Sequence, residues 1–82
     1  MRKYTTKIGV YDANTRILID IYTLSDTARC QQINDVRAMS NAKKAYRDRR
    51  LADLANQYGE VIYKLFADGL IDPIGIYTFD IL

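Results

Sequence analysis

The sequence of 82 residues contains no histidine and no tryptophan, and only one cysteine. Histidine is the commonest general base and the commonest metal ligand in proteins, so its absence removes most catalytic pairs and most metal sites. A single cysteine, Cys30, can form no internal disulfide, which excludes a secreted disulfide scaffold, and without histidine it cannot complete a structural zinc site. We therefore expect a protein that holds no metal ion and no cofactor.

Glycine is scarce as well, and the four glycines are scattered along the chain. No Walker or dinucleotide-binding spacing occurs, so the sequence has no loop of the kind that binds nucleotide phosphates. Carboxylates are the remaining catalytic candidates, and we interpret Asp12, Asp20 and Asp80 as exposed residues of turns and strands. We expect a protein that is not an enzyme.

Long apolar runs are also missing. The run Ile17–Ile19 is far shorter than the roughly 20 apolar residues that a membrane-spanning helix needs. The N-terminus is basic, but no apolar segment follows it as in a signal peptide. With 49% hydrophobic and 27% charged residues, residues 1–82 have a globular composition, and we expect one compact soluble domain in the cytoplasm.

Alternation of apolar residues predicts two strands near the N-terminus, over residues 4–11 and 17–23. The segment Asp12–Thr15 between them is rich in residues that hydrogen-bond their own backbone, and Asn14 tolerates a positive φ. This pattern predicts a β-hairpin. Ser25–Thr27 then supplies side-chain oxygens that can cap the N-terminus of a helix.

A helical pattern covers residues 26–68, which is too long for one helix in a domain of this size. Ser40 and Asn41 are good N-cap residues, so we predict a break there. A shorter helix then ends near residue 39, and a longer one runs over about 41–68. A strand over residues 30–39 is the alternative.

The long helix is predicted to end at Gly69, which adopts the left-handed conformation easily and lets Leu70 fold back onto Leu65. Pro73 prevents the helix from continuing, and residues 74–81 alternate as a closing strand. The predicted fold class is α+β. It consists of an N-terminal β-hairpin, two helices, and a C-terminal strand that completes a small antiparallel sheet.

Both faces of the predicted sheet carry apolar or aromatic residues. On the second strand, Leu18 and Tyr22 point opposite to the three isoleucines at positions 17, 19 and 21. Helices on one side alone would leave the other face exposed, which suggests a homodimer or a partner on that face. Helices or loops that cover both faces are the alternative.

The strongest local signal is the basic run Lys43–Arg50, inside the helical region. It contains five of the 12 basic residues and only one of the 10 acidic residues, so the rest of the chain has a net charge of −2. A charge distribution polarised in this way steers partners. The residues expected at a partner-binding surface are Lys43, Lys44, Tyr46, Arg47, Arg49 and Arg50.

Three interpretations of the basic run are open. In the first, the run is a solvated helix face. In the second, it contacts the phosphates of RNA or DNA, with Tyr46 stacked on a base. In the third, it docks on the acidic surface of a protein or a protein–nucleic acid complex, where arginine and tyrosine contribute strongly. A total net charge of only +2, and of −4 over residues 51–82, disfavours a dedicated nucleic-acid binder.

No motif attaches the chain to a named family. By size and composition alone it resembles the small proteins with which phages and other mobile elements block host machinery. This resemblance implies stoichiometric binding to a host target, of the host-takeover or anti-defence type. We therefore expect a small non-enzymatic protein that inhibits or modulates a macromolecular partner through the basic run. The alternative is a small RNA- or DNA-binding module that uses the same residues.

Overall fold

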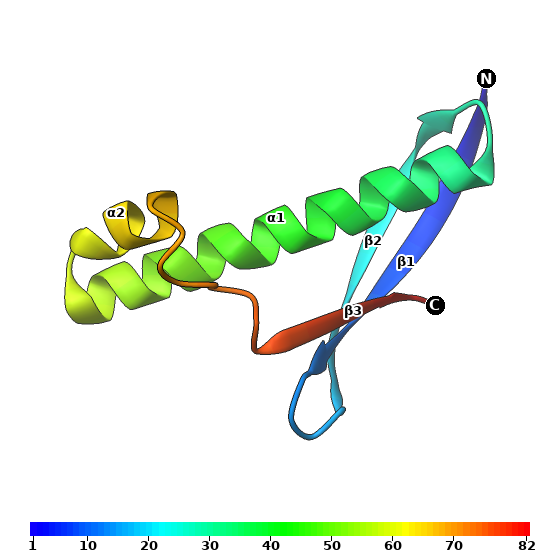
Figure 1. Ribbon diagram of the computed structural model, residues 1–82. Coiled ribbons are helices and arrows are strands. Elements are labelled where there is room, and N and C mark those ends of the chain that lie inside the picture. The colour runs from blue at the N-terminus through cyan, green and yellow to red at the C-terminus, as the bar shows by residue number, and fades with distance from the viewer.

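The computed structural model describes all 82 residues. Along the chain, two strands are followed by two helices and then by a third strand. The strands β1 (Arg2–Asp12) and β2 (Leu18–Ala28) form an antiparallel hairpin. The strand β3 (Tyr77–Ile81) pairs with the other side of β1, also antiparallel, so the strand order is β2-β1-β3 (Figure 1). The helices α1 (Gln31–Tyr58) and α2 (Val61–Ala67) connect the hairpin to β3. The predicted α+β arrangement is confirmed.

The division of the helical region differs from the prediction. α1 runs unbroken through Ser40 and Asn41, so the long helix spans residues 31–58 rather than 41–68. The alternative strand over residues 30–39 does not form. Two good N-cap residues do not end the helix here because the neighbouring turns pack on the sheet, and tertiary packing overrides local preference.

Glycine ends both helices. The break after α1 falls at Gly59, whose φ of 95° and ψ of 172° lie in a region restricted essentially to glycine. α2 ends in the predicted way, since Gly69 has a φ of 73°. The Gly69 N–H donates to the Phe66 carbonyl (3.0 Å) and the Leu70 N–H to the Leu65 carbonyl (2.9 Å). These two bonds form a Schellman motif, which confirms the predicted stop.

The strand β2 extends five residues beyond its predicted end at residue 23, to Ala28. Ser25 pairs with Thr5 across the sheet, and their hydroxyl oxygens are 2.8 Å apart. The prediction that Ser25–Thr27 caps a helix is therefore wrong, because this segment continues β2 and pairs with β1 instead. α1 begins after Cys30, whose side chain makes no capping hydrogen bond.

The main core lies between α1 and one face of the sheet. Ile8 and Val10 of β1 are fully buried, as are Ala38 and Ala42 of α1. The two alanines lie one helical turn apart on the same face, and their small side chains let the helix backbone approach the sheet. Partly buried side chains surround this centre: Tyr22, Leu24, Met39 and Phe79.

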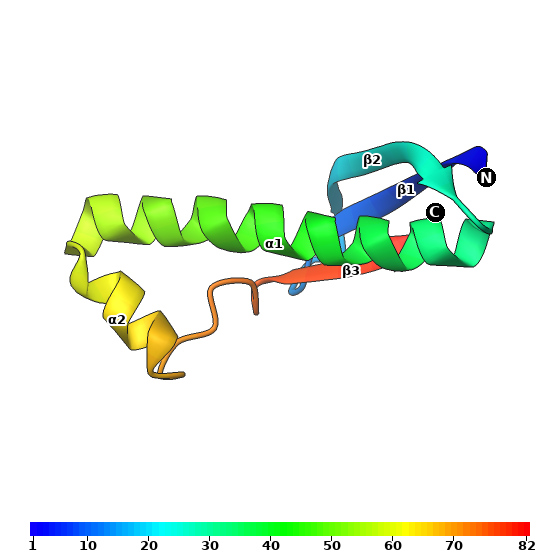
Figure 2. The same cartoon turned by 90° about the horizontal axis from the view of Figure 1, so that it is seen from above.

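The helix α1 extends well past the sheet. Its 28 residues span about 42 Å at 1.5 Å per residue, close to the longest dimension of the molecule, 44 Å. The N-terminal half crosses the strands, whereas α2 folds back beside the C-terminal half (Figures 1 and 2). Leu51 of α1 and Ile62 of α2 are buried as well, and the two helices contact each other. Neither helix is both long enough and apolar enough to cross a membrane.

The hairpin turn is organised by Asp12. Its Oδ1 accepts the backbone N–H groups of Asn14 (2.8 Å) and Thr15 (2.9 Å). The bond from Thr15, followed by that from Asn14, lowers the pKa of Asp12 because both stabilise the charged carboxylate. Arg16, and not Asn14, takes the left-handed conformation in this turn, with a φ of 62°.

We expect the substitution Arg16→Gly to stabilise the protein by about 0.5–1 kcal/mol, because glycine has no Cβ to clash at a positive φ. Asn14→Gly is the matched control. Asn14 has no positive φ, so glycine there only adds freedom to the unfolded chain and should lower the stability. Urea unfolding of both variants measures the two effects, and destabilisation by Arg16→Gly would contradict the assigned turn.

Candidate docking surface

Tyr46 is a core residue. The helix α1 points it at the sheet, where it is 5% exposed and its ring packs edge-on against Tyr77 and Phe79, with centroids 5.2 Å and 5.9 Å away. Its hydroxyl donates a hydrogen bond to the carboxylate of Asp20 on β2. Burial, followed by the contact with Asp20, raises the pKa of Tyr46 to about 12. Contrary to the prediction, Tyr46 is not accessible for stacking on a base or for contacting a partner.

Arg49 has intramolecular partners as well. Its guanidinium carbon lies 4.9 Å from the centroid of the Tyr46 ring, in a cation–π contact. The pKa of Asp20 is lowered first by the hydrogen bond from Tyr46, then by that from the backbone N–H of Ile21, with a smaller contribution from the charge of Arg49. Arg49 therefore belongs to the cluster between α1 and β2, apart from the remaining basic residues.

The remaining basic side chains of the run follow one stripe of α1, because spacings of three and four residues return to the same helix face. Three of them surround a shallow hollow of about 280 Å³, which Ser40 and Ile74 also line. No carboxylate lines this hollow. We call the stripe the basic surface, and it consists of Lys43, Lys44, Arg47 and Arg50.

The charge of the basic surface is largely uncompensated within the protein. The chain forms only two salt bridges, Arg47–Asp48 and Lys64–Asp68, each at 3.1 Å. Both are at the surface, where an ion pair contributes little to stability. Lys43, Lys44 and Arg50 form none.

Arg47 also has a structural contact. Its guanidinium carbon lies 5.6 Å from the centroid of the Phe66 ring on α2, so the side chain bridges the two helices. Together with its bond to Asp48, this contact holds the guanidinium in place beside the hollow. Arg47 therefore contributes both to the basic surface and to the packing of α2.

The three carboxylates considered as catalytic candidates are not gathered into one site. Asp12 organises the hairpin turn, and Asp20 accepts the Tyr46 hydroxyl. Asp80 pairs with Gly9 and lies on the face of the sheet opposite to α1. Two of the three thus have structural roles, and their placement gives no support to carboxylate catalysis.

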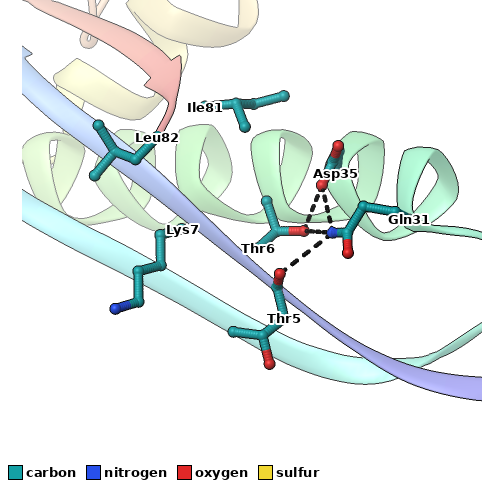
Figure 3. Close-up of a pocket in the computed structure, with 7 residues that line it drawn as sticks. All are labelled: Thr5, Thr6, Lys7, Gln31, Asp35, Ile81 and Leu82. Carbon is teal, nitrogen blue, oxygen red and sulfur yellow. Dashed lines mark hydrogen bonds between the residues drawn. The ribbon is translucent and has the colours of Figure 1, made fainter.

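A second pocket, of about 380 Å³, lies where β1 passes the first turns of α1 (Figure 3). The Thr6 hydroxyl is central to it, since it donates to Asp35 (2.6 Å) and accepts from Gln31 Nε2 (2.9 Å). The hydrogen bond from Thr6, followed by that from Gln31, lowers the pKa of Asp35. The adjacent Asn34 is fully buried, and its Oδ1 has no hydrogen-bond partner. No sequence pattern points to this cluster, because its members come from elements that only the fold brings together.

No helix covers the face of the sheet opposite to α1, because α2 contacts only α1. On β2 and the residue before it, Ile17, Ile19 and Ile21 are 62%, 51% and 45% exposed. Tyr11 lies across Gly9 on this face, so that a Cβ on Gly9 would come within 2.9 Å of the tyrosine side chain. The alternative in which both faces are covered by helices is therefore excluded, and a homodimer through the exposed face stays a prediction.

The comparisons with known proteins found no relative: no family model matches the chain, and no curated protein or solved structure matches it. The function is therefore inferred from the surface of this chain itself. Two features outside the core present charged or polar side chains around a hollow, namely the basic surface of α1 and the pocket beside β1.

Proposed function

We propose that this protein is a non-enzymatic binding protein that inhibits or modulates a macromolecular partner by docking the basic surface of α1 on an acidic region of a protein. The observation that carries the proposal is the absence of salt bridges at Lys43 and Lys44, which line a hollow free of carboxylates. Uncompensated charge around a concave site attracts anionic groups and accelerates association. Lysine and arginine bind carboxylates through charge-assisted hydrogen bonds.

Binding of RNA or DNA is the second candidate, since phosphates suit the same side chains. Two observations favour a protein instead. The burial of Tyr46 removes the only aromatic residue of the basic run that could stack on a base. Residues 51–82, which include α2 beside the basic surface, have a net charge of −4 and would repel a phosphate backbone.

The size and composition of the chain support a more specific form of the proposal. A short chain without histidine, and with one cysteine, suits stoichiometric blocking of host machinery by a phage or another mobile element. The proposed place of action is the cytoplasm, where one unpaired cysteine is typical. The proposed partner is then a host protein, or a protein–nucleic acid complex with an acidic surface.

We expect the double substitution Lys43→Glu/Lys44→Glu to reduce capture of the partner about 10-fold or more, because like charges then meet across the interface. Both lysines are exposed and form no intramolecular bond, so circular dichroism should show an unchanged fold. Arg47 is left in place because of its contact with Phe66. The measurement is affinity capture from a lysate of the host, with and without nuclease, followed by mass spectrometry.

The matched control is Arg16→Glu/Arg29→Glu, which changes the net charge equally but lies outside the basic surface. It should capture as much partner as the unmodified protein. Equal losses in both variants would show that total charge, and not the basic surface, determines binding. Loss of the partner on nuclease treatment would favour the nucleic-acid alternative.

A further inference from the structure

The strand β1 is covered over only part of its length on the β3 side. It has 11 residues, but β3 pairs with it only over residues 8–12. Just beyond this ladder, the Leu82 N–H donates to the Lys7 carbonyl (2.9 Å). Residues 3–6 therefore pair with β2 alone, and no strand lies on their other side.

The open side of β1 presents backbone groups in a fixed pattern. In an antiparallel sheet, the backbone groups of alternate residues point to the same edge. Because the Lys7 carbonyl faces β3, the N–H and carbonyl groups of Thr5 and Lys3 face the open side. The Thr5 carbonyl accepts a hydrogen bond from Gln31 Nε2 (3.2 Å), in agreement with this direction. The Thr5 N–H and both backbone groups of Lys3 face no strand.

Gln31 satisfies one backbone group on the open side of β1, the Thr5 carbonyl (Figure 3). Its Nε2 lies 3.2 Å from the Thr5 carbonyl, 2.9 Å from Thr6 Oγ1 and 2.8 Å from Asp35 Oδ1. A side-chain amide has only two N–H hydrogens for these three acceptors. An incoming backbone N–H can therefore replace the longest of the three bonds, while Gln31 keeps the other two.

The outer edge of β2 is less open to pairing. The backbone N–H groups of Ile21 and Thr27 donate to the carboxylates of Asp20 and Asp26, which precede them, at 2.7 Å each. Two donors of that edge are thus already satisfied, and two negative charges stand beside them. On the open side of β1, by contrast, no side chain accepts a hydrogen bond from the Lys3 or the Thr5 N–H.

We propose that the segment Lys3–Lys7 of β1 binds an extended acidic peptide of a partner protein as an added strand, antiparallel to β1 and in line with β3. The occupant is extended because the groups on offer are alternating backbone donors and acceptors. It is acidic because Lys3 and Lys7 flank Thr5 on one face of the strand, and opposite charges on neighbouring strands attract. This site is separate from the basic surface and does not depend on its role.

The test uses the isotope-labelled full chain and a synthetic peptide, Thr-Glu-Val-Thr-Glu-Thr, with blocked ends, at millimolar concentration. We expect the peptide to slow hydrogen exchange of the Thr5 amide about 10-fold, because this N–H gains a partner. The same peptide with lysine in place of glutamate should bind at least several-fold more weakly. Unchanged exchange at Thr5, or equal binding of the two peptides, would overturn the proposal.

Two variants separate strand addition from nonspecific attraction. Gln31→Ala removes the group that competes for the Thr5 carbonyl, so it should bind the peptide several-fold more tightly, whereas a merely structural role of Gln31 predicts equal or weaker binding. Thr5→Pro removes the N–H that faces the open side and should abolish binding, while Thr5→Ala keeps it and should bind normally. Tighter binding of the peptide by Gln31→Ala supports strand addition even if Thr5→Pro does not fold.

Discussion

Replacement of Tyr46 by alanine is expected to lower the free energy of unfolding by about 3–5 kcal/mol, a large share of the stability of a domain this small. The ring joins α1 to two strands at once, through Tyr77 and Phe79 on β3 and through Asp20 on β2. Alanine leaves a cavity at this junction and removes the ring from beneath Arg49. Urea unfolding monitored by circular dichroism measures the loss. A change below 1 kcal/mol would contradict the core position of Tyr46.

The substitution Tyr46→Phe isolates the hydroxyl, because the ring stays in place. We expect it to cost about 1 kcal/mol near neutral pH, the usual net value of one hydrogen bond. The pKa of Tyr46 is raised from 10.0 to about 12, so this contribution is fully present below pH 10 and is lost as the pH rises toward 12. The pKa of Asp20 is lowered, so the contribution is also lost as the pH falls below the ordinary value of 3.8.

The stability difference between the unmodified protein and Tyr46→Phe should therefore be constant at intermediate pH and shrink at both extremes. Because both proteins share all other titrating groups, their effects cancel in the difference. Denaturant titrations at a series of pH values measure it. A difference that does not shrink above pH 10 would show that the hydroxyl does not contact Asp20.

The second large effect is expected at Gly59, where substitution by alanine should lower the free energy of unfolding by about 1–3 kcal/mol. A helix over residues 41–68 would have placed Gly59 in its interior, where alanine is favourable. In the structure the expected change in stability has the opposite sign, because a φ of 95° with a ψ of 172° is accessible essentially only to glycine. A Cβ there would meet no atom within 4 Å, so the cost comes from the backbone conformation and not from a clash.

Gly69 provides the matched comparison. Its φ of 73° lies in the ordinary left-handed region, and a Cβ there also meets no atom within 4 Å. Gly69→Ala should cost about 1 kcal/mol, and Gly69→Asn less, because asparagine tolerates this region. Gly59→Asn should be as harmful as Gly59→Ala. Thermal unfolding of the four variants gives the order, and rescue by asparagine at Gly59 would contradict the assigned backbone conformation.

Local chemistry made several features of the fold predictable from the sequence. The alternation around Ile8 and Val10 predicts the first strand because side chains of a strand alternate between two faces. The pair Gly69–Leu70 predicts the end of α2, since only glycine adopts the left-handed conformation without cost. For the docking surface, the concentration of charge in residues 43–50 was visible, because it depends only on composition.

The arrangement of α1 on the sheet could not be predicted in the same way. Ser25 has the chemistry of a helix cap, yet it pairs with Thr5 in the sheet. Ser40 also has the chemistry of a helix cap, yet this residue lies inside α1. In both cases a local preference of about 1 kcal/mol is overridden by contacts with segments distant in the sequence.

Residue chemistry over a few neighbouring positions specifies the classes of element, the stop at Gly69 and the location of the basic run, so these features can be read from the sequence. Which members of the run face outward depends instead on how α1 packs on the sheet. At about 100° per residue, Lys44 lies about 160° and Arg47 about 100° around α1 from Tyr46, so the orientation of Tyr46 toward the core turns these two side chains outward. The packing of Ala38 and Ala42 on Ile8 sets that rotation, and this contact joins residues about 30 positions apart in the chain.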